Sequence, residues 1–69
     1  MVTLSQIQSK IIEAIKQSGL TQTEIAKRIG IKQPTLACYL SNKALPALDT
    51  FANLCIVLDL DANEILGIK

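Results

Sequence analysis

Apolar residues recur every three or four positions along most of the chain, the spacing expected of helices that bury one face. The first such stripe consists of Leu4, Ile7, Ile11, Ala14 and Ile15. It predicts a helix over residues 5–18, and Gly19 follows at the place where a glycine commonly ends a helix. Because no segment alternates apolar and polar residues for long, the pattern predicts no strand and an all-α protein.

A second helix is marked at both of its ends. Thr21 and Glu24 have the spacing of a capping box, in which each side chain accepts a hydrogen bond from the backbone N–H of the other residue. Its expected buried residues are Ile25, Ala26 and Ile29. Gly30 is expected to end the helix, because glycine adopts a positive φ with the least strain.

A third helix is expected to start near Lys32 or Gln33. Pro34 then lies in the first turn, where its missing N–H leaves no hydrogen bond unmade. The residues expected to face inward are Leu36 and Leu40. Asn42 is a suitable residue for a left-handed conformation after the helix, and a short loop over 43–47 follows.

Two further helices complete the pattern. The fourth is predicted over residues 48–58, with an inward face of Leu48, Phe51, Leu54, Cys55 and Leu58. Asp61 and Glu64 have the form of another capping box, which would open a last short helix carrying Ile65 and Leu66. Two interpretations remain open for four apolar residues near the end of the chain: they either complete the core or contact a second subunit. These residues are Ile56, Val57, Ile65 and Ile68.

Residues 22–41 have the organisation of two short helices joined by a tight turn. Ala26 is small where the third helix would cross the second, and Gly30 supplies the turn. The apolar residues that would hold the two helices at a fixed angle are Ile25, Ile29, Ile31, Leu36 and Tyr39. The polar residues left outward are Lys32, Gln33, Thr35 and Ser41. This is the pattern of a helix-turn-helix, whose second helix lies in the major groove of DNA.

On these residues the chain resembles the Cro and phage-repressor type of helix-turn-helix proteins, the XRE family, from about Ile7 to Ile68. The family pattern L-T-Q-x-x-L-A-x-x-x-G-V-S is matched at Leu20-Thr21-Gln22, Ile25-Ala26, Gly30 and Ile31-Lys32. Its later segment is matched over 46–51 and 58–66. The resemblance implies a compact five-helix domain spanning residues 1–69, with the helix-turn-helix at the second and third helices, that regulates transcription and more often represses it.

The resemblance also implies which residues contact DNA. The candidates are Gln22, Lys32, Gln33, Pro34, Thr35, Ala37, Cys38, Ser41, Asn42 and Lys43. Gln22, Lys32 and Lys43 are expected to hold phosphates, whereas Gln33 is expected to read a base edge, because a glutamine can pair bidentately with adenine.

Other candidates have lesser expected roles. Ala37 and Cys38 lie where the family makes further base contacts, and Asn42 lies where the loop backbone meets phosphate. Pro34 replaces a polar residue of the family and can touch only a thymine methyl group or a sugar.

One departure from the family concerns the core. Many relatives place an arginine on the first helix and a glutamate near the end of the third, as a partly buried ion pair. Here the two positions carry Ile15 and Leu40. An apolar pair of this kind often replaces a buried ion pair without loss of stability, so we expect van der Waals contact between the two side chains.

The charge is unevenly distributed along the chain, although the net charge is only +1. Residues 1–43 carry six basic and two acidic residues, whereas residues 44–69 carry one basic and four acidic residues. The basic part contains the predicted helix-turn-helix, which is where a polyanion would dock.

A single short recognition helix reads only a few base pairs, so specificity needs two half-sites about one helical turn apart. We therefore expect a homodimer on a palindromic operator of double-stranded DNA, with contacts from the fourth and fifth helices and their loop. The alternative is a helical module that binds another protein, such as an antitoxin-like partner. An exposed apolar patch without affinity for any duplex would favour that alternative.

The sequence offers little material for catalysis or metal binding. It contains no histidine, no cluster of carboxylates and no Gly-rich phosphate loop, so we expect no enzyme and no small-molecule ligand. Cys38 and Cys55 lack metal-ligand spacing and are interpreted as thiols in a reducing compartment; no metal or other cofactor is expected. A redox switch is the alternative interpretation of Cys38.

The sequence shows no membrane or export signal. The longest apolar run, 54–58, is far shorter than the ~20 residues that span a bilayer, and the opening residues lack the positive segment of a signal peptide. We expect a soluble cytoplasmic protein, and the resemblance implies a prokaryotic or phage-encoded one.

Overall fold

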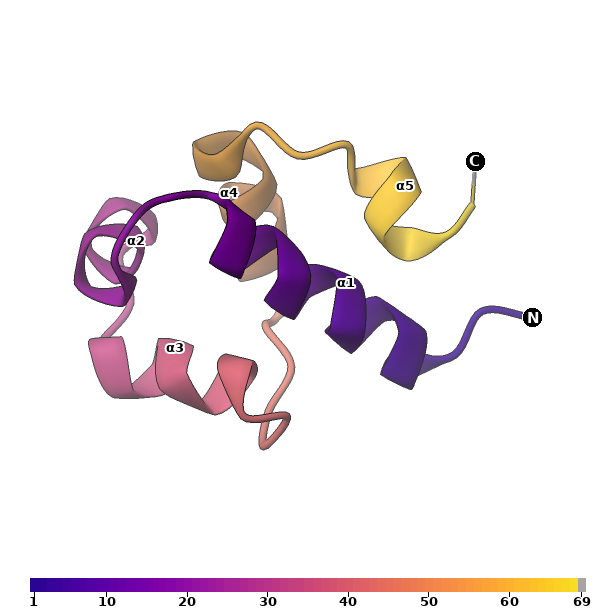
Figure 1. The fold of residues 1–69 in the computed structure, drawn as a ribbon, viewed down its shortest axis with the longest axis horizontal. Helices are drawn as coiled ribbons and strands as arrows, with labels where there is room; N and C mark the ends of the chain where they lie inside the picture. The colour runs from indigo at the N-terminus through magenta and orange to yellow at the C-terminus, as the bar shows by residue number, and fades with distance from the viewer. Residues whose placement is uncertain (69) are drawn as a thin grey trace.

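A computed structural model describes residues 1–68, which form five helices and no strand. The helices are α1 (Leu4–Gln17), α2 (Gln22–Ile29), α3 (Gln33–Leu40), α4 (Leu48–Leu58) and α5 (Ala62–Leu66) (Figure 1). The all-α prediction is confirmed, and the expected bounds of the first four helices hold to within a residue. Lys69, which entered the charge count above, lies outside the described residues.

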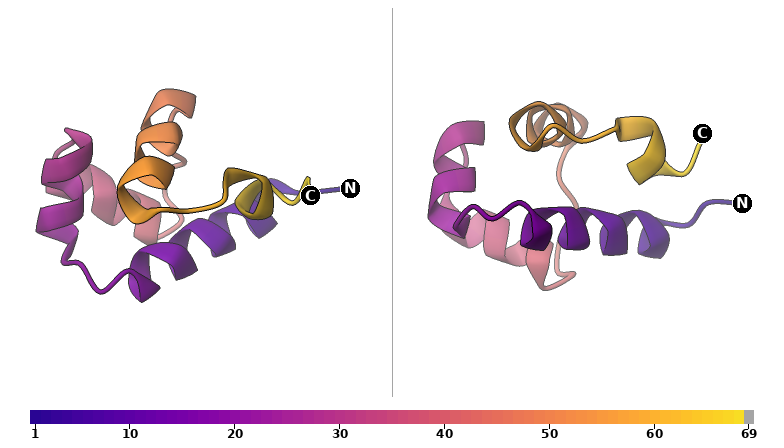
Figure 2. Two further views of the ribbon diagram at one scale, coloured as in Figure 1. Left: turned by 90° about the horizontal axis from the view of Figure 1, so that it is seen from above. Right: turned by 45° about the horizontal axis from the view of Figure 1, so that its top comes forward.

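The helices divide into two groups that share one core. α2 packs against α3 and α4, whereas α1 packs against α3 and α5. Figures 1 and 2 show α2 and α3 at one end of the molecule and the two chain termini at the opposite end, with α1 running between. The core contains Ile11, Ile15, Ile25, Ala26, Ile29, Leu36, Tyr39, Leu54 and Ile65. The pair formed by α2 and α3 is therefore supported by α4, which packs against α2, and by α1, which packs against α3.

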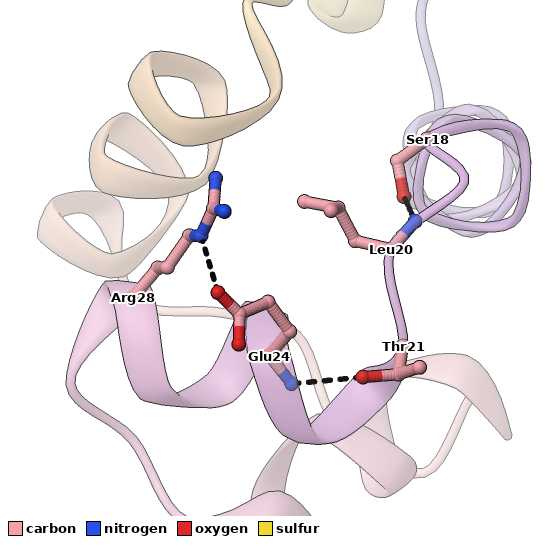
Figure 3. A network of polar contacts seen from close by, with 5 residues as sticks. All are labelled: Ser18, Leu20, Thr21, Glu24 and Arg28. Atoms are coloured by element: carbon pink, nitrogen blue, oxygen red, sulfur yellow. Dashed lines mark hydrogen bonds and ion pairs between the residues drawn. The ribbon is translucent and has the colours of Figure 1, made fainter.

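The helix starts follow the capping chemistry only in part. Thr21 Oγ1 accepts from the N–H of Glu24 at 3.1 Å, but the Glu24 carboxylate accepts from Arg28 Nε at 2.9 Å instead of completing the capping box (Figure 3). A complete capping box stands at α1, where Thr3 and Gln6 exchange hydrogen bonds of 3.2 and 3.0 Å. Thus α1 begins at Leu4, one residue earlier than predicted.

The predicted inward position of Leu48 is wrong, because its side chain is 88% exposed. The other four residues of that predicted face are buried or half-buried. Leu48 lies at the edge of the face, in the first turn of α4, and shares a side of the helix with Ala52 and Ile56, four and eight residues later. Spacing alone could not tell this edge position from a buried one.

Of the late apolar residues, two belong to the core and two remain on the surface. Ile65 is buried and Val57 packs against the core, whereas Ile56 and Ile68 stay exposed. Leu40 also packs against the cluster that contains Ile15, so the core accepts the apolar pair that replaces the family's ion pair. Direct contact between Ile15 and Leu40 stays a prediction.

Both cysteines are free thiols. Cys55 is buried, and burial raises the pKa of its thiol, as does the nearby negative charge of Asp61 to a smaller degree. Cys38 lies half-buried on α3.

Candidate nucleic-acid interface

Gly30 sets the angle between α2 and α3. Its backbone is left-handed (φ 77°, ψ 29°), and its N–H and that of Ile31 both donate to the carbonyl of Ala26. A Cβ added at Gly30 would meet no atom within 4 Å. The glycine is therefore required for its conformation and not for space.

The start of α3 is built without a side-chain cap. Lys32 is the N-cap residue in extended conformation, and its carbonyl accepts from the N–H groups of Thr35 and Leu36. A lysine side chain has no acceptor to offer the helix, so its ammonium group stays in solvent at the helix N-terminus. Pro34 occupies the first turn, as predicted.

One face of α3 is anchored and the other is open. Leu36 is fully buried and Tyr39 nearly so, which fixes the rotation of the helix about its axis. The candidate residues Lys32, Gln33, Pro34, Thr35 and Ser41 are exposed, and Ala37 and Cys38 are half-buried. The predicted candidates of α3 are thus at least partly accessible to solvent.

A hydrogen bond joins the first residues of α2 and α3. Gln33 Nε2 donates to Gln22 Oε1 at 3.1 Å, and both side chains are exposed. The sequence predicts separate roles for these two residues and gives no sign of the contact between them. No local signal could have revealed it, because the residues are eleven positions apart and meet only through the turn at Gly30.

The end of α3 is closed by its own polar groups. Ser41 Oγ donates to the carbonyl of Cys38 at 3.2 Å, and Asn42 has the predicted left-handed backbone (φ 63°). The N–H of Lys43 donates to the same Cys38 carbonyl at 3.0 Å. The Ser41 hydroxyl hydrogen is therefore already donated within the end of the helix.

Three exposed lysines lie on α2 or at the two ends of α3. Lys27, Lys32 and Lys43 are exposed and form no ion pair among the described residues, whereas Arg28 pairs with Glu24. Acidic residues instead line a groove between α1 and the α4–α5 connection: Glu13, Asp59, Asp61 and Glu64. In that groove Lys10 Nζ donates to the carbonyl of Glu64 at 3.0 Å, which ties α1 to α5.

A family model described as helix-turn-helix matches residues 11–65, from within α1 through most of α5. The chain belongs to the helix-turn-helix family of the Cro and phage-repressor type. Members of this XRE family are DNA-binding regulators of transcription and not a class of enzymes. No curated protein and no solved structure matches the chain.

Two structural findings bear on other kinds of function. Among residues 1–68, no helix is long and apolar enough to cross a membrane. The same residues contain no group of three or more side chains of the metal-binding types placed to hold an ion.

Proposed function

We propose that this XRE-family protein regulates transcription by inserting α3 into the major groove of a specific double-stranded DNA site. The observation that carries the proposal is the exposed polar start of α3, held to α2 by the hydrogen bond between Gln33 and Gln22 and to the core by Leu36. A recognition residue must be positioned before it can discriminate between bases, and this arrangement positions Gln33 from two sides.

The proposed roles differ along the interface. Gln33 reads a base edge, with Thr35, Ala37, Cys38 and Pro34 beside it on the same surface. Lys32 and Lys43 lie at the two ends of α3 and hold phosphates on either side of the groove, with Gln22 and Asn42 next to them. Ser41 contributes less, because its hydroxyl already donates within the helix.

The same proposal includes repression and pairing. A protein seated in the major groove excludes other proteins from that stretch of DNA, so we infer that its usual effect is repression. Two copies on a palindromic operator would double the sequence that is read. The resemblance further suggests action in the cytoplasm of a prokaryotic or phage-infected cell.

The test is selection of duplexes from a random DNA library, followed by titration of the best duplex. The proposal predicts an enriched palindromic motif with two bound chains per duplex. Binding of one chain per selected duplex would contradict the pairing, and binding without any enriched motif would contradict specific recognition. Failure to bind any duplex would instead favour the protein-binding alternative, since α4 exposes apolar side chains.

A further inference from the structure

The groove between α1 and the α4–α5 connection has an apolar floor. Ala14, Leu58 and Leu60 are half-buried there, so each of them remains partly accessible to solvent. The groove has a volume of about 610 Å³, which lies within the ~300–1,000 Å³ typical of clefts that hold ligands. It is therefore large enough for several side chains of a partner. We call it the α1–α5 groove, since it is lined by residues within 10–18 of α1 and 58–65 of the later chain.

The charged residues of the α1–α5 groove give it a negative charge. Four carboxylates and one ammonium group line it, a balance of −3. The ammonium group belongs to Lys10 and donates to the backbone carbonyl of Glu64 at 3.0 Å. The carboxylate of Glu13 accepts from the amide of Gln17 at 3.2 Å, and this donor carries no charge. The groove therefore repels anions and attracts cations.

Asp59, on the rim of the groove, is placed against local preference. It is the C-cap residue of α4, it is exposed, and its backbone is left-handed (φ 54°, ψ 51°). Its carboxylate lies at the negative end of the helix dipole, and glycine or asparagine fits this backbone with less strain. By these rules the carboxylate does not stabilise α4. Residues that break a local rule are expected at functional sites, so the charge of Asp59 is better explained by a ligand of the groove.

The α1–α5 groove lies away from the surface that is proposed to contact DNA. In Figure 1 and in the right-hand view of Figure 2, the α4–α5 connection lies on one side of α1 and α3 lies on the other. None of the residues that line the groove is a candidate DNA contact. A ligand in the groove therefore leaves the start of α3 free to meet DNA.

We propose that the α1–α5 groove binds a segment of a partner protein in which lysine or arginine residues flank an aliphatic residue. The aliphatic side chain would lie on Leu58 and Leu60, and the cations would meet the carboxylates of the rim. Lysine and arginine suit such a groove, because their apolar stems can lie along apolar surface while their charged ends stay in water. An exposed ion pair changes affinity by only about 1.4- to 5-fold, so charge alone would not hold one partner and the contact with the floor is required.

Selection from a random library of displayed peptides, with the whole protein as target, tests the class of partner. The enriched peptides should share an aliphatic residue between two or more lysine or arginine residues. No enrichment, or enrichment of peptides without this pattern, would overturn the proposal. A synthetic copy of the enriched peptide should bind more tightly than a copy with serine at the aliphatic position, and more tightly than the polyamine spermine. Equal binding of spermine would indicate a polyamine site and would overturn the protein partner.

Two double variants test whether the enriched peptide lies in the groove. Glu13→Gln combined with Asp59→Asn should weaken its binding roughly 2- to 30-fold, because two exposed ion pairs are lost. Glu24→Gln combined with Asp49→Asn is the matched control: it changes the net charge equally but outside the groove, and should alter affinity by less than about 1.5-fold at physiological salt. None of the four side chains is buried, and thermal unfolding checks that both variants fold. Equal weakening by the two variants, or no weakening by the first, would overturn the groove as the binding site.

Discussion

Replacing Gln33 by alanine is the sharpest test of how the protein reads DNA. The amide of Gln33 has two N–H groups and one carbonyl oxygen, and one N–H is donated to Gln22 at 3.1 Å. The remaining N–H and the oxygen match N7 and the N6 amino group of adenine. Gln33→Ala should therefore weaken binding to the preferred site by about 1–3 kcal/mol per bidentate contact, or about 5- to 150-fold, and relax preference at one base pair per half-site.

Gln22→Ala should weaken discrimination at the same base pair indirectly. It removes the hydrogen bond that orients Gln33, and an exposed bond of this kind contributes about 0.5–1.5 kcal/mol. The double variant should therefore lose less than the sum of the two single losses, with an interaction energy of about 0.5 kcal/mol or more. Gln17→Ala is the matched control, because Gln17 is exposed on α1 and its amide also donates to a neighbouring side chain.

The assay is equilibrium binding of each variant to the preferred duplex and to duplexes changed at one base pair. Equal weakening of Gln33→Ala on all duplexes would refute base reading by this residue. Additive losses in the double variant would refute the positioning of Gln33 by Gln22.

Further predictions concern phosphate contact, the turn, the core and pH. Lys43→Ala should weaken binding to all duplexes alike and lower the slope of log affinity against log salt concentration by about one, as a salt titration would show. Gly30→Ala should destabilise the fold by about 1–2 kcal/mol in urea unfolding, because alanine is strained at φ 77°. Leu54→Ala should cost about 2–5 kcal/mol, whereas Leu48→Ala should change stability by less than about 0.5 kcal/mol. The thiol of Cys55 ionises less readily in the folded protein than in the unfolded chain, so the free energy of unfolding should fall as the pH rises above the ordinary thiol pKa of 9.0. Cys55→Ala should flatten this fall, as thermal unfolding at several pH values would show.

The sequence predicted the helices well because each boundary has its own local signal. Gly30 and Asn42 take the left-handed backbone expected of them, and Pro34 stands in the first turn of α3. The errors arose where two local interactions compete or where position on a helix face matters. Glu24 forms an ion pair with Arg28 instead of completing a capping box. Leu48 lies at the edge of the helix face that was predicted to be buried.

The candidate site was predicted as a set of positions but not as a set of contacts. The four-residue spacing of Leu36 and Leu40 indicated which side of α3 would be buried, and hence which side would be open. The bond between Gln22 and Gln33 depends on the angle at the turn, and the internal hydrogen bond of Ser41 depends on how α3 ends. Both are tertiary or conformational outcomes that side-chain type alone does not determine.

The hydrogen bond between Lys10 and Glu64 has a consequence for folding during synthesis. It joins residues 54 positions apart, and α1 also packs against the late helix α5. During synthesis at about 5–20 residues per second, the ribosome needs on the order of 2 to 10 s to proceed from the end of α1 at Gln17 to the end of α5 at Leu66. For those seconds α1 can pack against α3 but lacks the partner that α5 provides, so a chaperone that binds apolar segments should find part of the apolar side of α1 still open.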